Sequence, residues 1–399
     1  MSFARTVRPS LPAPLPAVRG EGGRRPGGGL QRTIGNRAVR RLLRRPILQR
    51  AETDDRNCGT LTDIETDVDT EVNAQIGAAR TAAGTPLTGS RLGALLSGVH
   101  SRLGAGAVTP IEGFIEALPS TKRTTVGTSL AGTKYAGVEA VNRFYLLQTT
   151  GLAHVVGVAA KIHGLCVGAD KLGHFFGEGF EYARVLVGGG TVADTESAGN
   201  ALEIGLEGLG ATGVFSNADR AANRAGLQFY ADLVTTPGMT FHIASYIAAD
   251  WNEANNPSFY ASAEGSVVWA NLLTGSWSGT LTLSSTGPAI PVTVTLSATA
   301  AGAVTGSYSY TPPGRTTART GRITAGTITQ QTTSVTGNLP GSAAVSATPV
   351  SGVRIDFDWS ERGSRGKGRW DSVNEQTLNG TWGTSRFRSG HGAWSLTKV

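Results

Sequence analysis

Acidic and imidazole side chains recur at helical spacing in the middle of the chain. Asp170, His174 and Glu178 are four residues apart, so on one helix they would share a face. Glu203 and Glu207 repeat the same spacing. Ionised carboxylates are costly to bury alone. We therefore expect these faces to be exposed, or to meet one another, a cation or a metal ion.

A divalent metal ion is the partner that this mixture of groups favours. His174 would supply nitrogen, and Asp170 and Glu203 would supply oxygen, with Glu178 and Glu207 as alternative oxygen donors; zinc or manganese suits such a site. A remaining carboxylate could act as a general base toward a metal-bound water, whose pKa the ion lowers. The pattern predicts a metal-dependent hydrolase with three candidate catalytic carboxylates: Glu178, Glu207 and Asp219.

Other polar residues near these groups allow simpler interpretations. Ser216 precedes a predicted helix on which Asp219, Asn223 and Gly226 share one face. Lys171 could pair with a carboxylate of the site or lie on the surface. Asp170 and Ser216 could serve only as helix caps. Lys171, Ser216 and Asn223 are therefore predicted as additional polar residues of the site.

Two different residue patterns predict the architecture of the body. Between residues 58 and 260 the apolar residues recur at helical spacing, which predicts about six to nine helices. Residues 61–83 are typical of an amphipathic helix, whose apolar positions are Ile64, Val68, Val72 and Ile76. Residues 144–160 are uncharged but contain polar side chains, so a buried helix is favoured over a membrane span.

From Trp277 onward, apolar residues alternate with Thr and Ser, and turn sequences at 287–288, 312–314 and 338–341 separate the alternating segments. This pattern predicts an antiparallel meander of about eight strands, closed into a barrel or folded as a small sandwich. Its last segments resemble strands of avidin-like or lipocalin-like barrels. The predicted fold is α+β and multidomain: a disordered basic arm (1–50), an all-α bundle (51–265) and a β-barrel-like binding domain (270–399).

The central region resembles YfiM-like bacterial envelope proteins, a group associated with VanZ-like proteins. The matching motif is Asp-Lys-x-x-His-Phe, which begins at Asp170, followed by Glu203 or Glu207 and by Ser-x-x-Asp from Ser216. The resemblance covers about sixty residues and implies a shared polar site. The resemblance does not imply a particular reaction.

The first fifty residues form an unusually basic segment. They contain twelve arginines and one acidic residue, a net charge of +11, whereas the whole chain carries +7 and the rest therefore −4. Their Pro and Gly content predicts disorder. A basic arm can bind nucleic acid, but no nucleic-acid-binding motif accompanies it, and residues 51–272 hold 23 acidic against 13 basic side chains. Nucleic acid is a disfavoured partner.

Within this arm, residues 30–43 read LQRTIGNRAVRRLL, with an apolar stripe that would form a helix only on docking. The segment resembles the leader of cargo proteins of extracellular contractile injection systems. The resemblance implies loading into an injection particle, through its tube lumen or a loading factor. The leader residues predicted to bind are Leu30, Arg32, Ile34, Gly35, Asn36 and Leu42.

The expected location and function follow from these features. The first twenty residues lack the apolar core of a secretory signal, so we expect synthesis and packaging in the cytoplasm, followed by delivery to a target cell. Cys58 and Cys166 are the only cysteines; they fit a reducing compartment, although one disulfide between them is an alternative. The favoured function is an injected effector, expected to be a toxin with hydrolase activity. The alternatives are a membrane-perturbing or binding effector without enzyme activity, and a structural component of the particle lumen.

Overall fold

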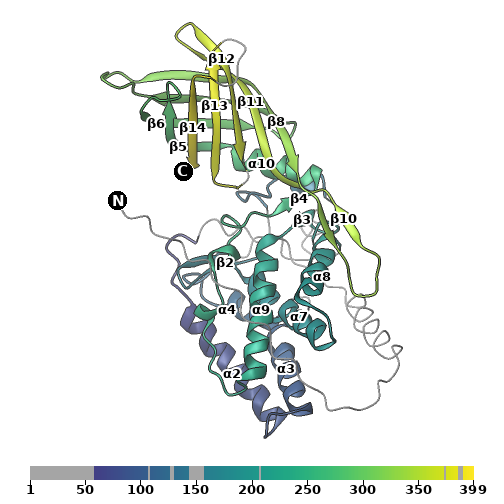
Figure 1. The fold of residues 1–399 in the computed structure, drawn as a ribbon. Helices are drawn as coiled ribbons and strands as arrows, with labels where there is room; N and C mark the ends of the chain where they lie inside the picture. Colours follow the sequence, from purple (N-terminus) through teal and green to yellow (C-terminus); the bar gives the residue numbers. More distant parts are fainter. Residues whose placement is uncertain are drawn as a thin grey trace.

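The computed structural model describes residues 58–106, 108–125, 130–142, 157–205, 208–372, 374–384 and 390–399. A helical part and a β-barrel are stacked end to end (Figure 1). The predicted α+β class is confirmed, and the C-terminal part is a closed barrel rather than a sandwich. The predicted arm (1–50) and its leader lie outside the described residues.

The helical part packs its helices around an apolar core. Phe175 is central to it, with the rings of Phe176 and Phe229 at 4.7 and 5.4 Å. The four apolar residues predicted for the first helix are all buried, as the helical period requires. The helices are α2 (Glu65–Ala83), α3 (Ser90–Leu103), α4 (Pro110–Ala117), α6 (Ala169–Phe176), α7 (Glu178–Val187), α8 (Val192–Ile204) and α9 (Asn217–Thr235).

The helical part also contains a small antiparallel hairpin that the sequence analysis did not predict. Its strands are β1 (Ala159–Ile162) and β2 (Leu165–Gly168). The prediction of a helix over 144–160 is wrong at its C-terminal end, where Ala159 and Ala160 belong to β1; residues 143–156 lie outside the described residues. Ala159 and Ala160 are buried, and a short apolar segment fits a buried strand as well as a helix. Among the described residues, no helix is both long enough and apolar enough to cross a membrane.

The barrel is an eight-stranded antiparallel meander. Each strand pairs with the next, and pairing of β11 with β12 and of β14 with β5 closes the cylinder. Along β6, buried and exposed residues alternate, as expected for one face turned inward. The strands are β5 (Gly275–Thr282), β6 (Ala289–Ala298), β7 (Ala303–Tyr310), β8 (Arg319–Thr332), β11 (Val350–Glu361), β12 (Ser364–Ser372), β13 (Thr377–Thr384) and β14 (Gly392–Lys398).

One end of the barrel is covered by α10 (Ser262–Leu273), which lies between the barrel and the helical part (Figure 1). Trp269 of α10 is buried in the barrel core. The indole N–H of Trp277, on β5, donates to the carbonyl of Leu273 at 2.9 Å. The predicted domain boundary between residues 265 and 270 thus falls inside a helix that packs against the barrel.

Two further connections join the parts. The short strands β3 (Val214–Phe215) and β4 (Phe259–Tyr260) extend the barrel sheet, because Tyr260 pairs with Val350 of β11. The hairpin of β9 (Val335–Gly337) and β10 (Val345–Ala347) leaves the barrel and lies against α8. There the Asn338 backbone N–H donates to the Ser197 carbonyl at 2.9 Å. Main-chain hydrogen bonds therefore link the helical part directly to the barrel.

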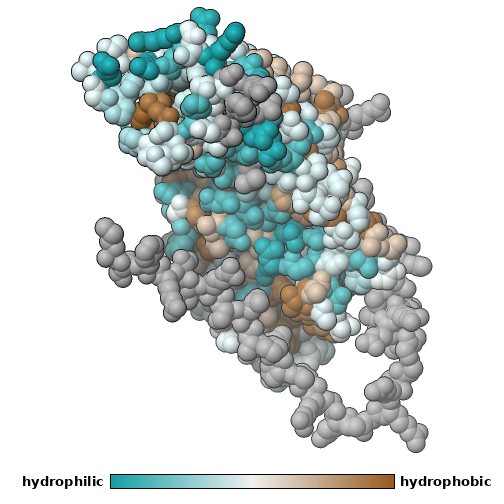
Figure 2. All heavy atoms as spheres, turned by 45° about the horizontal axis from the view of Figure 1, so that its top comes forward, coloured by the Kyte–Doolittle hydropathy of each residue, from teal (hydrophilic) through white to brown (hydrophobic). Residues whose placement is uncertain are grey.

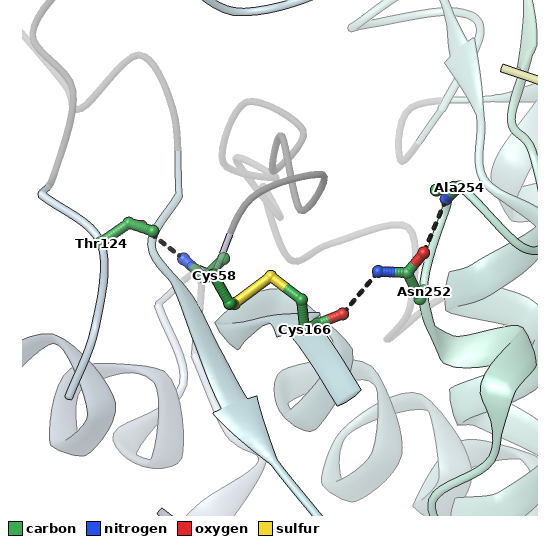
Figure 3. Close-up of a disulfide and its surroundings, with 6 residues drawn as sticks. Cys58, Thr124, Cys166, Asn252 and Ala254 are labelled. Atoms are coloured by element: carbon green, nitrogen blue, oxygen red, sulfur yellow. Dashed lines mark hydrogen bonds between the residues drawn. A yellow bond between two sulfur atoms is a disulfide. The ribbon is translucent and has the colours of Figure 1, made fainter. Parts of the chain in front are cut away.

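Cys58 and Cys166 form a disulfide, the alternative that the sequence left open. It joins the start of the described chain to β2. Figure 3 shows the Asn252 side chain beside it, donating to the Cys166 carbonyl at 2.7 Å and accepting from the Ala254 backbone N–H at 2.9 Å. Disulfides persist mainly in oxidising compartments, so the bond does not fit the reducing compartment that two lone cysteines suggested.

The face of the molecule seen in Figure 2 is mostly hydrophilic, and its hydrophobic residues are spread over separate small areas.

Candidate functional site

The predicted polar residues meet where α6 crosses α9. His174 of α6 lies between two side chains of α9: its Nε2 is 3.1 Å from Asp219 Oδ2, and its Nδ1 is 3.2 Å from Asn223 Oδ1. Asp219 and Asn223 are buried. One histidine is thus held through both ring nitrogens by two residues that lie one helical turn apart on the same face of α9, the shared face that their i, i+4 spacing predicted.

Ser216 fixes the start of α9 and so the position of Asp219. Its Oγ accepts a hydrogen bond from the Asp219 backbone N–H at 3.1 Å, which confirms the predicted N-cap. The Asp219 carboxylate does not complete a reciprocal capping box; it turns instead toward His174.

Glycine lets α7 lie very close to α9. A Cβ atom on Gly226 would come within 1.9 Å of the Phe175 carbonyl oxygen and 2.9 Å of Gly179 Cα. Gly226, predicted to share a face with Asp219 and Asn223, is therefore a packing position. It brings the backbones together and does not itself line the site.

Glu203 approaches the same point from α8. It is buried, and its Oε2 accepts from the Ser216 backbone N–H at 3.0 Å. His174, Glu203 and Asp219 each offer one ligand atom, and these atoms all lie within 4.8 Å of one another. One imidazole and two carboxylates in this arrangement could hold a metal ion, so His174 and Glu203 of the predicted ligand set come together as expected.

The third potential metal ligand is Asp219, whereas Asp170 was predicted for this position. Asp170 lies near the start of α6, and its Oδ2 accepts from Lys171 Nζ at 2.8 Å. The potential ligand group does not include it. Residues 170 and 174 do share a side of α6, but the carboxylate nearer to the imidazole comes from another helix.

Glu178 is not on the same helix as His174. α6 ends at Phe176, and Glu178 begins α7 after Gly177. A Cβ on Gly177 would lie 2.8 Å from the Gly173 carbonyl oxygen and 2.9 Å from that of Gly104. The prediction of one continuous helix from Asp170 to Glu178 is therefore wrong. The helix breaks at Gly177, where other backbone atoms lie too close for a side chain. Glu207 lies outside the described residues.

Lys171 places an ammonium group in the site. It is buried, and its Nζ lies 2.6 Å from Asp219 Oδ1 and 3.0 Å from Glu253 Oε1, in addition to its contact with Asp170. The prediction of Lys171 as a polar site residue agrees with this position. Arg220, the other cation considered as a partner, instead pairs with Glu196 at 2.7 Å.

The buried charges continue from the site toward the barrel. Glu253 also accepts from Lys134 Nζ at 2.7 Å, and Lys134 contacts Glu375 Oε1 at 2.8 Å. The Tyr260 hydroxyl donates to the same Glu375 oxygen at 2.6 Å. All four side chains are buried. No sequence pattern predicts this chain of contacts, because its members are single residues from distant segments.

The three potential metal ligands perturb one another's protonation. Burial, together with the charge of Asp219, raises the pKa of Glu203 to about 8. Burial alone would lower the pKa of His174, but nearby carboxylates, Asp219 foremost, raise it well above its usual value. Burial alone would raise the pKa of Asp219, yet the charges of His174 and Lys171 lower it. At neutral pH this favours a protonated Glu203, a cationic His174 and an ionised Asp219.

Comparison of the chain with protein-family models, curated proteins and solved structures found no match.

Proposed function

We propose that this protein is a cargo effector of a contractile injection particle, and that its helical part is a metal-dependent hydrolase. The observation that carries the enzymatic part is the convergence of His174, Glu203 and Asp219 from three helices on one buried point. Perturbed titratable groups gathered in this way are typical of catalytic sites.

The donor set suits zinc or manganese, since imidazole and carboxylate oxygen are ligands of both. The three ligand atoms lie up to 4.8 Å apart. Zinc binds each ligand atom at about 2.0–2.2 Å, which requires shorter separations between them, so binding would draw these side chains inward by about 1 Å. It would also displace the protons held by His174 and Glu203. A bound ion would supply an acidified water for hydrolysis.

Residues around the ligand group have definable roles in this proposal. Asn223 orients the His174 ring through Nδ1 and leaves Nε2 directed toward Asp219. Glu178 opens α7 beside the site, and its charge contributes to the raised pKa of His174. It is the candidate general base, with Glu207 as the alternative. Lys171 offsets the charge of the buried carboxylates.

The delivery part of the proposal rests on the leader resemblance at residues 30–43 and on its cationic, apolar-striped composition. A chain without residues 1–50 is expected to fold and yet be missing from purified particles. Equal loading of this shortened chain and the full chain would reject the leader's role.

The enzymatic part is tested by producing the full chain inside target cells. His174→Ala is expected to abolish toxicity while the circular dichroism spectrum and melting temperature stay near those of the parent. His242→Ala is the matched control, because His242 is exposed and also contacts one carboxylate, Asp69, at 3.2 Å. Undiminished toxicity of a folded His174→Ala variant would reject the hydrolase.

One observation favours a second candidate, a binding effector without enzymatic activity. Lys171 already places a cation 2.6 Å from Asp219, so the buried charges balance in part without a metal ion. On this account the charge cluster serves to hold α6, α9 and the barrel together. The same variants separate the two candidates, since a purely structural cluster predicts loss of stability together with loss of toxicity.

A further inference from the structure

The barrel contains a pocket at the end away from α10. β5 starts next to the C-terminus of α10, and the pocket is lined by Leu281 near the other end of β5 and by residues at the corresponding ends of β7, β11 and β13. Its volume is about 210 Å³. It shares no residue with the His174 site, so its ligand is a separate question from the proposed hydrolysis.

Aromatic side chains form much of its wall. The rings of Trp359 and Trp382 pack edge to face at 5.3 Å, and those of Tyr308 and Trp394 do so at 5.4 Å. Tyr310 also lines the pocket. Rings held by their neighbours in this way present rigid apolar faces to a ligand.

A pair of oppositely charged side chains, Glu361 and Arg319, lies beside this aromatic wall. Glu361 accepts from the hydroxyls of Tyr308 and Tyr310 at 3.3 and 3.2 Å and lies 3.5 Å from Arg319 Nη1. Its side chain is only 10% exposed. The carboxylate and the guanidinium carry opposite charges, so together they offer acceptors and donors without a net charge.

The three tryptophans that line the pocket differ in the hydrogen bonding of their indole N–H groups. The N–H groups of Trp359 and Trp382 donate to the carbonyls of Gly383 and Thr282. The N–H of Trp394 is buried and, within the described parts of the chain, has no hydrogen-bond partner. An N–H without exposed surface cannot reach a ligand, so Trp394 contributes its ring, and not its N–H, to the pocket wall.

We propose that this pocket binds one neutral sugar ring. The C–H face of a pyranose would pack on the tryptophan rings. Its hydroxyls, which both donate and accept, match Glu361 and Arg319. The volume is below the roughly 300–1,000 Å³ of pockets for drug-sized ligands, which limits the site to a single ring.

The polar lining argues against the two other ligand classes that an aromatic pocket can take. A quaternary ammonium ion would find its favourable carboxylate already paired with Arg319. A fatty acyl chain would exclude water from Glu361 and Arg319 and offer neither of them a hydrogen bond in return. These ligands are alternative outcomes of the test.

The test uses the full chain and saturation-transfer-difference NMR, which detects weak binding. The probes are the methyl glycosides of glucose, galactose, mannose, N-acetylglucosamine and fucose, with choline and octanoate as competitors. We expect at least one glycoside to bind saturably and neither competitor to displace it. Trp394→Phe replaces the two-ring indole of the wall with a smaller ring, and should weaken binding about tenfold through the lost apolar contact.

Trp269→Phe is the matched control, because Trp269 is buried in α10 at the covered end and its N–H also lacks a partner within the described residues. It should bind as the parent does. Glu361→Gln provides a second variant, expected to weaken binding while the melting temperature is retained. Absence of binding by every glycoside, binding of choline or octanoate instead, or equal affinity in Trp394→Phe would overturn the proposal.

Discussion

The ammonium nitrogen of Lys171 lies 2.6 Å from Asp219 Oδ1, and both side chains are completely buried. The same ammonium contacts Glu253, so one lysine of α6 binds carboxylates from α9 and from the segment that leads to the barrel. Lys171→Met should therefore leave these carboxylates buried without their cation. We expect a loss of about 3–5 kcal/mol in the free energy of unfolding, measured by urea denaturation.

Lys122→Met is the control for that prediction. Lys122 also pairs with an aspartate, Asp67, at 2.8 Å, but both side chains are about 30% exposed. A solvated pair of this kind contributes about 0–1 kcal/mol. If the two variants lost similar stability, burial of the Lys171 cluster would not be the cause.

Glu203 should make the folded protein less stable as the pH rises. Its pKa is raised from 4.5 to about 8, so between these values the folded state keeps a proton that the unfolded state has released. Stability then falls with increasing pH by up to about 1.4 kcal/mol per pH unit, and the loss is complete above the folded pKa. Glu203→Gln should flatten the melting temperature measured from pH 5 to pH 8. An unchanged pH profile in this variant would assign the dependence to other groups.

The disulfide should stabilise the helical part. It closes a loop of 108 residues, for which the loss of chain entropy in the unfolded state predicts about 4–5 kcal/mol. Cys58→Ser combined with Cys166→Ser should lower the melting temperature, and a reductant should lower that of the parent but not that of the double variant. A reductant effect of equal size in both would exclude the disulfide as its cause.

Gly226→Ala should push α9 away from both α6 and α7 and disturb the site indirectly. The added methyl group would overlap the Phe175 carbonyl oxygen, and we expect a loss of about 1–3 kcal/mol on thermal unfolding. Gly77→Ala in α2 is the control, because a Cβ there meets nothing within 4 Å. That variant should gain up to about 1 kcal/mol from helix propensity. Equal effects of the two alanines would contradict the close crossing.

Elements whose burial follows a period were predictable from the sequence. The apolar stripe of α2 and the alternation of apolar and polar residues along β6 each predict which side of the element faces the core. The i, i+4 spacing of Asp219 and Asn223 likewise predicted that they share a face of α9, and in the structure both contact His174.

Contacts made by isolated residues were not predictable. Lys134, Glu253 and Glu375 come from segments more than 100 residues apart, and only the fold brings them together. The helix break at Gly177 depends on how closely Gly104 approaches, which no local pattern encodes. The hairpin of β1 and β2 is too short for its four-residue strands to be distinguished from a helical turn.

Metal content is the most direct test of the proposed site. Elemental analysis by mass spectrometry measures the metal content of three purified proteins: the full chain, its His174→Ala variant and its His242→Ala variant. We predict close to one zinc or manganese per parent chain at pH 8, less at pH 6 because His174 and Glu203 hold protons there, none in His174→Ala, and parental content in His242→Ala. A folded parent chain that binds neither metal at pH 8, or a His174→Ala variant that retains it, would contradict the account.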